Sequence, residues 1–443
     1  MAALPSFPWL PGWPRSNAGQ AWCRTALARD VSLEDSVQTV ARQLAPAGEA
    51  DLALVFASSS YASDLQRLLP LLRLKLKARH WIGCSGGGVV GTDATGVAHE
   101  LEQEPALSVT LLRLPGAELI PFAIDTTALP DLDGPAEPWR ALVAAGAPVD
   151  ASLLLLVDPG CNAVNDLING LDYAFAGGAK VGGIASPHSS SHGSLLFDDQ
   201  VREGAVGCLI GGAWAIEPVV AQGCRPIGPV LEVEQVQRNV VLEVSQGELR
   251  RSPVAALQAI LSDLSPDERE QVKHSLFLGV GRSDFSLADR RQVASAFLVR
   301  NLIGVDPRNG AVAVAERMRV GQKVQFQLRD GDASRQEGRQ LLSALARREG
   351  PEPLLALLFA CLGRGQGLYG EADGDVGLCR EAFAGLPISG VFCNGEIGPV
   401  GGTTHLHGYT ASWGFLVPRP VPATGDSRSE ATDAEAGGAV RGD

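Results

Sequence analysis

An arginine and a glutamate near the C-terminal end of the chain have the chemistry and the setting to bind a charged ligand. Arg364 stands in Leu-Gly-Arg-Gly, just after the apolar run 354–359, and Glu396 stands in Asn-Gly-Glu-Ile-Gly after the next apolar run. A guanidinium can hold a carboxylate through two hydrogen bonds, and a carboxylate can hold an ammonium group. With Gly365 and Gly395 beside them, the two residues suit a zwitterionic amino acid, unless they pair with each other.

Two histidines offer a different chemistry in the same part of the sequence. His405 and His407 alternate within an expected strand and would share one face of it, with Glu396 as a third possible metal ligand. Such a trio would support a metal-assisted hydrolase. Pairs of His two residues apart also occur on ordinary protein surfaces, so we expect no metal or other cofactor here.

A glycine-rich turn, Gly83-Cys-Ser-Gly-Gly-Gly-Val-Val-Gly91, follows an apolar run nearer the N-terminus. Its backbone N–H groups could surround an anion, but the residues after it are typical of a strand, and the spacing matches neither common phosphate-binding motif. We therefore expect a tight hairpin beside a pocket, with Cys84 and Ser85 lining it. No His lies nearby in sequence to activate Cys84 as a nucleophile, so a buried thiol is expected.

Arg300 and Asn301 interrupt a third apolar run, from 297 to 304. Polar groups inside such a run must face a partner or a cavity, which makes both residues candidates for ligand contact. Asp306, just before a proline, is typical of a turn instead.

The elements that must position these residues recur along the chain. A short apolar run is followed by a helical stretch and then by a second apolar run that ends in glycine. The runs and their key glycines are 52–56 with Gly83, 153–157 with Gly183, and 354–359 with Gly390. A further strand follows each unit. Strand–helix–strand units predict an α/β fold with mixed sheets, and the shared glycine-rich hairpin indicates internal repetition.

A segment of different character separates the second and third units. Residues 230–249 alternate apolar and polar side chains, as edge or antiparallel strands do. Helices are expected over 254–263 and from 265 onward, and Asn309-Gly310 predicts a hairpin between strands at 297–304 and 311–315. We place a domain boundary near Leu249, which divides the chain into an arm with a first helix (1–49), two domains (50–249 and 250–418) and a tail (419–443). The tail has too little apolar surface to fold and is predicted to be disordered.

Composition restricts the class of partner. The 443 residues carry 37 Lys and Arg against 50 Asp and Glu, a formal net charge of −13, which disfavours nucleic acid and anionic lipid. The eight Cys residues form no C-x-x-C pair, as expected for reduced thiols in a cytoplasmic protein. No run approaches the length of a membrane span. The N-terminus lacks the pattern of a secretory signal. An organellar presequence is the alternative that the sequence leaves standing.

Four patterns in order make residues 50 to 418 resemble the FIST family of F-box and intracellular signal transduction proteins, in both its N-terminal and C-terminal domains. They are the 82–91 turn, Val299-Arg-Asn-Leu-Ile-Gly-Val-Asp306, Phe359-Ala-Cys-Leu-Gly-Arg-Gly365 and Gly395-Glu-Ile-Gly-Pro399. The resemblance implies a sensory module that binds a small molecule, with amino acids as proposed ligands, and an undefined downstream signalling protein. No nucleophile–base–orienter set stands at recognisable spacing in the sequence, so we expect no catalysis. A protein–protein adaptor, as among F-box relatives, is the alternative beside the hydrolase.

Overall fold

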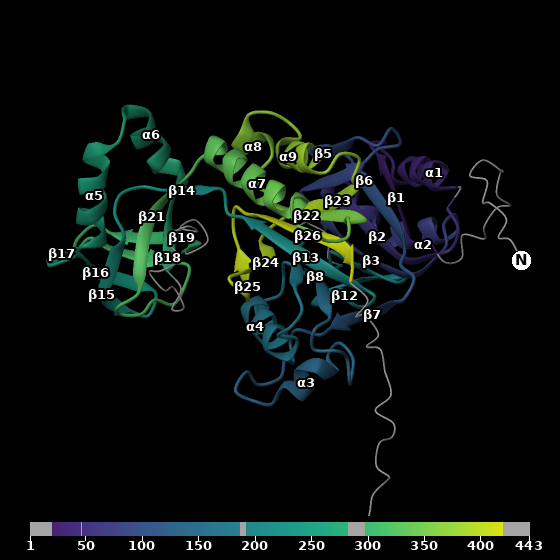
Figure 1. Ribbon diagram of the computed structural model, residues 1–443, viewed down its shortest axis with the longest axis horizontal. Helices are drawn as coiled ribbons and strands as arrows, with labels where there is room; N and C mark the ends of the chain where they lie inside the picture. Colours follow the sequence, from purple (N-terminus) through teal and green to yellow (C-terminus); the bar gives the residue numbers. More distant parts are fainter. Residues whose placement is uncertain (1–19, 46, 187–191, 282–296, 420–443) are drawn as a thin grey trace, which may run out of the picture.

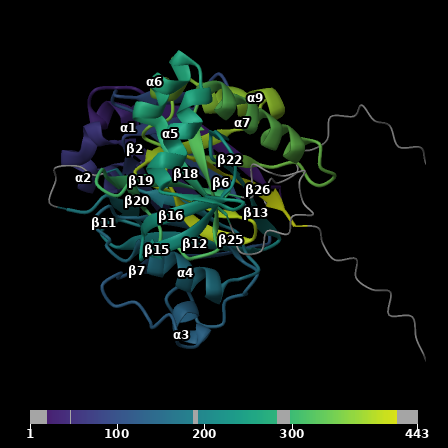
Figure 2. The same cartoon turned by 90° about the vertical axis from the view of Figure 1, so that its left-hand side faces the viewer.

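The computed structural model describes residues 20–45, 47–186, 192–281 and 297–419. Its body contains three six-stranded mixed sheets, and a six-stranded barrel lies at one side of that body (Figure 1). Figure 2 views the molecule from the barrel side, with the barrel in front of the sheets. The predicted α/β class with mixed sheets is confirmed.

The body is built from three copies of one unit. Each copy contains an edge strand, a helix, a central strand, a helical segment, a parallel strand, a hairpin and a return strand. The first copy is β1 (Trp22–Ala28), α1 (Leu33–Leu44), β2 (Ala50–Ser58), η2 (Ser59–Asp64), α2 (Leu65–Arg73), β3 (Ala78–Gly86), β4 (Gly88–Thr92), β5 (Ala98–Glu102) and β6 (Leu107–Arg113). The second is β7 (Ala117–Ile124), α3 (Ala136–Ala141), β8 (Ser152–Val157), α4 (Val164–Ala174), β9 (Lys180–Ile184), β10 (Leu195–Phe197), β11 (Gln200–Arg202) and β12 (Ala205–Gly212). The third is β13 (Trp214–Ala221), α7 (Gly331–Ala346), β22 (Leu355–Cys361), α8 (Gln366–Tyr369), α9 (Gly374–Ala382), β23 (Ile388–Cys393), β24 (Glu396–Val400), β25 (Thr403–His407) and β26 (Ala411–Pro418).

The three units exchange their hairpins in a cycle. The strand orders are β1-β6-β2-β3-β10-β11, β7-β12-β8-β9-β24-β25 and β13-β26-β22-β23-β4-β5. The first unit thus adds β4–β5 to the third sheet, the third adds β24–β25 to the second sheet, and the second adds β10–β11 to the first. Because each sheet is completed by another unit, the three sheets depend on one another.

One glycine per unit lets the parallel strand approach the central strand closely. Gly83, Gly182 and Gly390 face Val55, Leu155 and Leu358 in the three registers. A Cβ built on these glycines would lie 1.8, 1.8 and 1.9 Å from the carbonyl oxygen of the facing residue. In the second unit this position is Gly182, the residue before the predicted key glycine Gly183.

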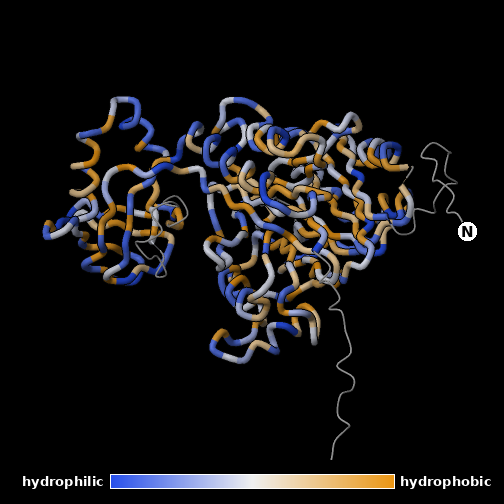
Figure 3. The backbone as a smooth tube through the Cα atoms, viewed as in Figure 1, coloured by the Kyte–Doolittle hydropathy of each residue, from blue (hydrophilic) through white to orange (hydrophobic). Residues whose placement is uncertain are grey.

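Alternation along the central strands divides the apolar side chains between two layers. Leu54, Phe56, Leu154, Leu156, Leu357 and Phe359 belong to one central core shared by all three sheets. The intervening side chains face outward, where α1 and α2, α3 and α4, and α7 and α9 each cover one sheet. Figure 3 shows apolar residues concentrated within the body and along the barrel strands.

The barrel is inserted between β13 and α7 of the third unit. It comprises β14 (Cys224–Pro226), β15 (Leu231–Gln237), β16 (Val240–Gln246), β17 (Leu249–Arg251), α5 (Pro253–Asp263), α6 (Pro266–Ser275), β18 (Leu276–Gly281), β19 (Phe297–Asp306), β20 (Ala311–Val314) and β21 (Lys323–Arg329). Six of these strands form the ring, in the order β15-β16-β20-β19-β18-β21, and β14 and β17 pair with β21 and β16 outside it. The ring closes where β21 pairs with β18. Ser265 and Glu268 form a capping box that fixes the start of α6.

The predicted strands and hairpin around Asn309-Gly310 are confirmed by β19 and β20. Leu249, the predicted boundary, is the first residue of β17 within the barrel. Residues 1–19 of the expected arm and 420–443 of the expected tail lie outside the described residues. Arg419 itself is described and forms an ion pair with Asp150.

Candidate functional site at the junction of the barrel and the sheets

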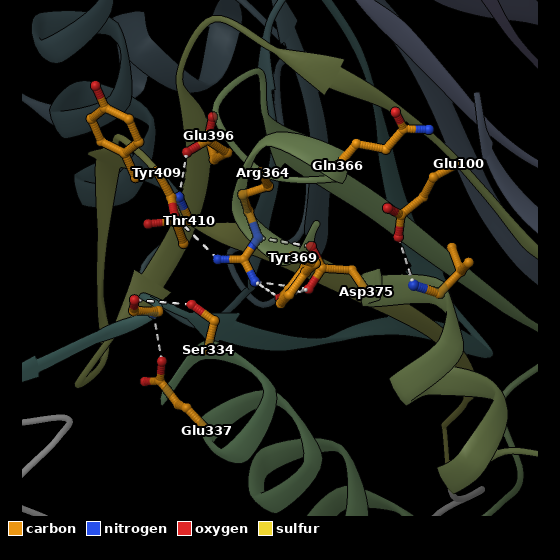
Figure 4. A network of polar contacts seen from close by, with 12 residues as sticks. Glu100, Ser334, Glu337, Arg364, Gln366, Tyr369, Asp375, Glu396, Tyr409 and Thr410 are labelled. Atoms are coloured by element: carbon orange, nitrogen blue, oxygen red, sulfur yellow. Dashed lines mark hydrogen bonds and ion pairs between the residues drawn. The ribbon is translucent and has the colours of Figure 1, made fainter. Parts of the chain in front are cut away.

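Arg364 is the centre of a buried polar cluster between the barrel and the body (Figure 4). It follows β22 and its side chain is 0% exposed. Its Nε and Nη2 donate to the two carboxylate oxygens of Asp375 at 2.7 and 2.8 Å, and Nη2 also donates to the hydroxyl of Tyr369 at 2.6 Å. Its Nη1 donates to the carbonyl oxygen of Tyr409 at 3.2 Å. The ion-pair partner of Arg364 is therefore Asp375 rather than Glu396.

The first turn of α9 brings two carboxyl groups to this cluster. Asp375 lies in that turn, and Glu100 of β5 accepts a hydrogen bond from the backbone N–H of Val376 at 2.7 Å. The other oxygen of Glu100, Oε2, has no hydrogen-bond partner among the residues the structure describes. Burial, and then the negative charge of Asp375, raise the pKa of Glu100 to about 8.

Glu396 begins β24 and is fully buried. Its Oε2 accepts the backbone N–H of Thr410 at 3.0 Å, whereas no described residue forms a hydrogen bond with its Oε1. Burial raises the pKa of this carboxyl to about 8, even though the Thr410 amide and Arg364 lower it. The nearby thiol of Cys361 has a pKa raised to about 11, by burial first and then by the charge of Glu396.

A fourth carboxyl group joins the cluster from α7. Glu337 accepts the backbone N–H of Gly223 at 2.6 Å, and Ser334 donates its hydroxyl to the carbonyl oxygen of the same glycine at 2.9 Å. Burial raises the pKa of Glu337, while the Gly223 amide and Arg364 oppose that rise. We use the name charge cluster for Arg364, Tyr369, Asp375, Glu100, Glu337 and Glu396. Four carboxyl groups surround one guanidinium, so they cannot all ionise at low cost without a further positive charge.

His407 pairs directly with Glu396 in the β24–β25 ladder, so the two side chains share a face. Its Nε2 lies 2.9 Å from the carbonyl oxygen of Gly398 and must donate to it, which leaves Nδ1 as an acceptor. Burial lowers the pKa of His407 to about 3 and keeps the ring neutral. Nδ1 has no hydrogen-bond partner within the described ranges. Once Glu396 is ionised, its Oε1 and Nδ1 of His407 are two buried acceptors.

His405 and His407 are the two histidines that the sequence offered as possible metal ligands. The rings of His405 and His407 lie edge to face with their centroids 6.0 Å apart. In the part of the chain that is described, no group of three or more His, Cys, Asp and Glu side chains is arranged to hold a metal ion. The predicted trio with Glu396 therefore does not form a metal site in this conformation.

Of the other predicted site residues, some lie where the barrel meets the body and others lie in the central core. Arg300 of β19 forms an ion pair with Glu316 and donates to the carbonyl oxygen of Leu406 at 3.0 Å, so it joins the barrel to β25. Asn301 beside it is exposed. Gly365 has φ +57° and precedes α8, whose first N–H donates to Glu102.

Gly395 precedes Glu396 and accepts the backbone N–H of Ile184. Cys84 lies in the central core, where burial raises its pKa above the usual range of a thiol. Ser85 is also buried, and its hydroxyl has no hydrogen-bond partner among the described side chains and backbone groups. Neither residue belongs to the charge cluster.

Sequence reasoning missed Asp375, Glu100, Glu337 and Tyr369. Glu100 occurs in Ala-His-Glu-Leu-Glu, a short segment in which three of five residues are polar and nothing indicates burial. Asp375 follows a glycine in a segment rich in small and acidic residues, and Glu337 lies on a helix with several other charges. These acids come close to Arg364 only in the folded structure, and no spacing in the sequence indicates that they do.

Comparison with known proteins identifies the family. Residues 51–246 match the FIST N domain, and residues 256–399 match the FIST C domain. An uncharacterized protein of Mycobacterium tuberculosis H37Rv is 35% identical over 384 residues, which cover 85% of this chain and 94% of the relative. An uncharacterized protein of Mycobacterium bovis is 32% identical over 406 residues, covering 90% and 98%. The chain belongs to the FIST family, whose domains are generally sensory or signal-transduction domains. No helix within the described residues is long and apolar enough to cross a membrane.

Proposed function

We propose that this chain is a non-catalytic sensor for a small zwitterionic ligand such as an amino acid. The observation that carries the proposal is the pair of buried acceptors on one face of β24 and β25, Oε1 of Glu396 and Nδ1 of His407. An ammonium group has three N–H donors and a positive charge, so on binding it would favour the ionised form of Glu396, donate to the carboxylate and to His407, and compensate the excess of carboxyl groups in the charge cluster.

A buried donor for the ligand's carboxylate is also present. Nη1 of Arg329, the last residue of β21, has no hydrogen-bond partner among the described residues. Its guanidinium carbon lies 4.6 Å from the centroid of the Tyr409 ring, and the next residue, Thr410, binds Glu396. Because Arg364 already forms its ion pair with Asp375, we assign the binding of the ligand's carboxylate to Arg329 instead of Arg364.

A surface depression elsewhere does not fit this chemistry. It measures about 480 Å³ and lies between the β4–β5 turn and the C-terminal end of α9, lined by Gly96, Gly377, Arg380, Glu381, Ala384, Gly385 and Leu386. None of the residues of the charge cluster reaches it. Glu381 there already forms an ion pair with Arg339.

A thermal-shift screen with matched ligand pairs tests the proposal. Each amino acid is compared with the hydroxy acid that replaces its amine by a hydroxyl group. A ligand at about a hundredfold its Kd stabilises the folded protein by about 2.7 kcal/mol. The proposal expects at least one amino acid to raise Tm while its hydroxy acid does not. Equal shifts from both members would contradict the role of the ammonium group. A stable co-purifying protein with no response to any small molecule would favour the adaptor.

A further inference from the structure

The barrel and the body are joined by two chain connections, and the first of them lies against the charge cluster. The first connection, Gln222–Gly223, runs from β13 to β14, and the second passes through Asp330 between β21 and α7. Gly223 has φ +68°, and a Cβ built there would lie 2.5 Å from Oγ of Ser334 and 2.7 Å from Nη1 of Arg364. Only glycine fits this position, and the backbone there lies directly against the cluster.

A third connection is non-covalent and is made by the turn Gly408–Thr410, which we name the junction turn. On the barrel side, the Tyr409 ring packs edge to face on Phe277, with centroids 4.8 Å apart, and against the guanidinium of Arg329. On the body side, the Tyr409 carbonyl accepts from Arg364 and the Thr410 amide donates to Glu396. One short segment therefore contacts the barrel through its ring and the cluster through its backbone.

The junction turn is held in a conformation that a non-glycine residue rarely adopts. Tyr409 has φ +65°, in the left-handed region. Such a backbone persists where its surroundings impose it, and here the contacts of its ring with the barrel and of its backbone with the cluster do so. Loss of the contacts on one side should release the turn and weaken the contacts on the other.

We infer that the junction turn couples the position of the barrel to the state of the charge cluster, so that the barrel is the movable output element of the protein. The site lies under the turn, with Glu396 fully buried. In this inference the turn moves to admit a ligand to the buried Glu396, and that movement changes the contacts of Phe277 and Arg329 in the barrel. This inference adds regulation to the proposed site, and it rests on the proposed function only for the ligand that would drive the movement.

The remaining barrel contacts are compatible with a limited movement. Gln222 donates to the carbonyl oxygen of Phe297 and accepts the amide of Val299, both at 2.9 Å, so the first strand connection stays attached to β19. Arg225 binds Glu268 and Asp330 within or beside the barrel. The Gln222 bonds and the bond from Arg300 to the carbonyl oxygen of Leu406 both cross from the body to the barrel, so the barrel can shift only slightly unless these bonds break.

Hydrogen exchange of the full chain without ligand tests the coupling. Phe277→Ala removes the barrel's contact with Tyr409, and Tyr409→Asn removes the ring while keeping a residue that tolerates the left-handed region. Ile303→Ala is the control, because Ile303 is a barrel residue that is 60% exposed. The two test variants should speed exchange of the Thr410 and Gly223 amides, which donate to Glu396 and Glu337, at least fivefold. The control should leave both at the wild-type rate.

Wild-type exchange at both amides in Tyr409→Asn would overturn the inference. In Phe277→Ala, faster exchange confined to barrel amides would also overturn it, because that pattern means local loosening without coupling. The experiment contains no ligand, so a failed ligand screen and a failed exchange test are separate results.

Discussion

Arg364 and Asp375 form a bidentate ion pair in which both side chains are almost completely buried, at 0% and 3% exposure. The pair lies where β22 ends and α9 begins. Tyr369 binds both partners, since it accepts from Arg364 and donates to Asp375 at 2.8 Å. A fully satisfied pair of this kind fixes the position of the loop from 362 to 375 against the sheet.

Removing one partner of this pair should destabilise the protein strongly. Asp375→Asn leaves a buried guanidinium without its counter-charge, which costs about 3–5 kcal/mol of unfolding free energy. The matched control is Glu371→Gln, because Glu371 also pairs with an arginine, Arg335, but its side chain is 66% exposed. That change should cost no more than about 1 kcal/mol. Urea unfolding measures both, and equal losses in the two variants would contradict the account of the buried pair.

Stability should depend on pH through Glu396. Its pKa is raised from 4.5 to about 8 in the folded protein, so the folded state binds more protons than the unfolded state between these values. The stabilisation is complete below about pH 4.5 and is lost as pH rises towards 8. Glu396→Gln is neutral at all pH values, so its stability relative to wild type should increase from pH 5.5 to pH 8.5, by on the order of 1–4 kcal/mol.

Urea unfolding at both pH values gives this difference, with Glu371→Gln as a control whose difference should stay constant. Glu100 contributes in the same direction, since its pKa is also raised to about 8. A Glu396→Gln difference that does not change with pH would show that the carboxyl titrates normally.

The exchanged hairpins predict that the two matched segments do not fold separately. Residues 51–246 alone would lack β24–β25 for the second sheet and would leave β4–β5 without the third sheet. They would also contain only part of the barrel. We expect this fragment to show no cooperative urea transition and the full chain to show one. A cooperative transition of the fragment, followed by circular dichroism, would contradict the interlocked arrangement.

Because β2 and β3 lie so close together, adding a single methyl group between them should lower the free energy of unfolding by a large amount. Gly83→Ala places a Cβ against the Val55 carbonyl, where the backbone of two strands must shift. We expect a loss of about 3 kcal/mol of unfolding free energy, at the upper end of the usual range for overpacking. Gly48→Ala is the matched control, because no atom lies within 4 Å of its built Cβ, and it should be nearly neutral. A mild effect of Gly83→Ala would mean that the strands separate easily.

Local sequence signals predicted the individual strands and helices well. The pairing of strands that are distant in sequence could not be predicted in this way. The apolar run of β22, the hairpin at Asn309-Gly310 and the start of α6 after Ser265 each depend on neighbours in sequence. The hairpin exchange joins residues as distant as Val90 and Gly390, for which a single sequence has no signal. The sequence alone does not show which glycine of the pair Gly182-Gly183 faces Leu155, because only the strand register separates the two.

The site was predicted in part for the same reason. Arg364 and Glu396 stand beside glycines at strand ends, which is a local pattern, and both prove to be buried in one cluster. Their partners come from β5, α7 and α9, so the choice between Glu396 and Asp375 as the partner of Arg364 depended on tertiary structure. Arg329 and Tyr409 gave no local signal at all, because their importance arises from the packing of the barrel on the body.

Calorimetric titration of an amino acid found in the thermal-shift screen tests the central claim most directly. The comparison is between wild type, Glu396→Gln and Glu371→Gln. The account predicts that Glu396→Gln raises Kd at least tenfold, because it removes a charged hydrogen bond worth about 1.5–3 kcal/mol, while Glu371→Gln leaves Kd unchanged. Equal Kd values for wild type and Glu396→Gln would show that the ligand binds elsewhere and would contradict the proposed site.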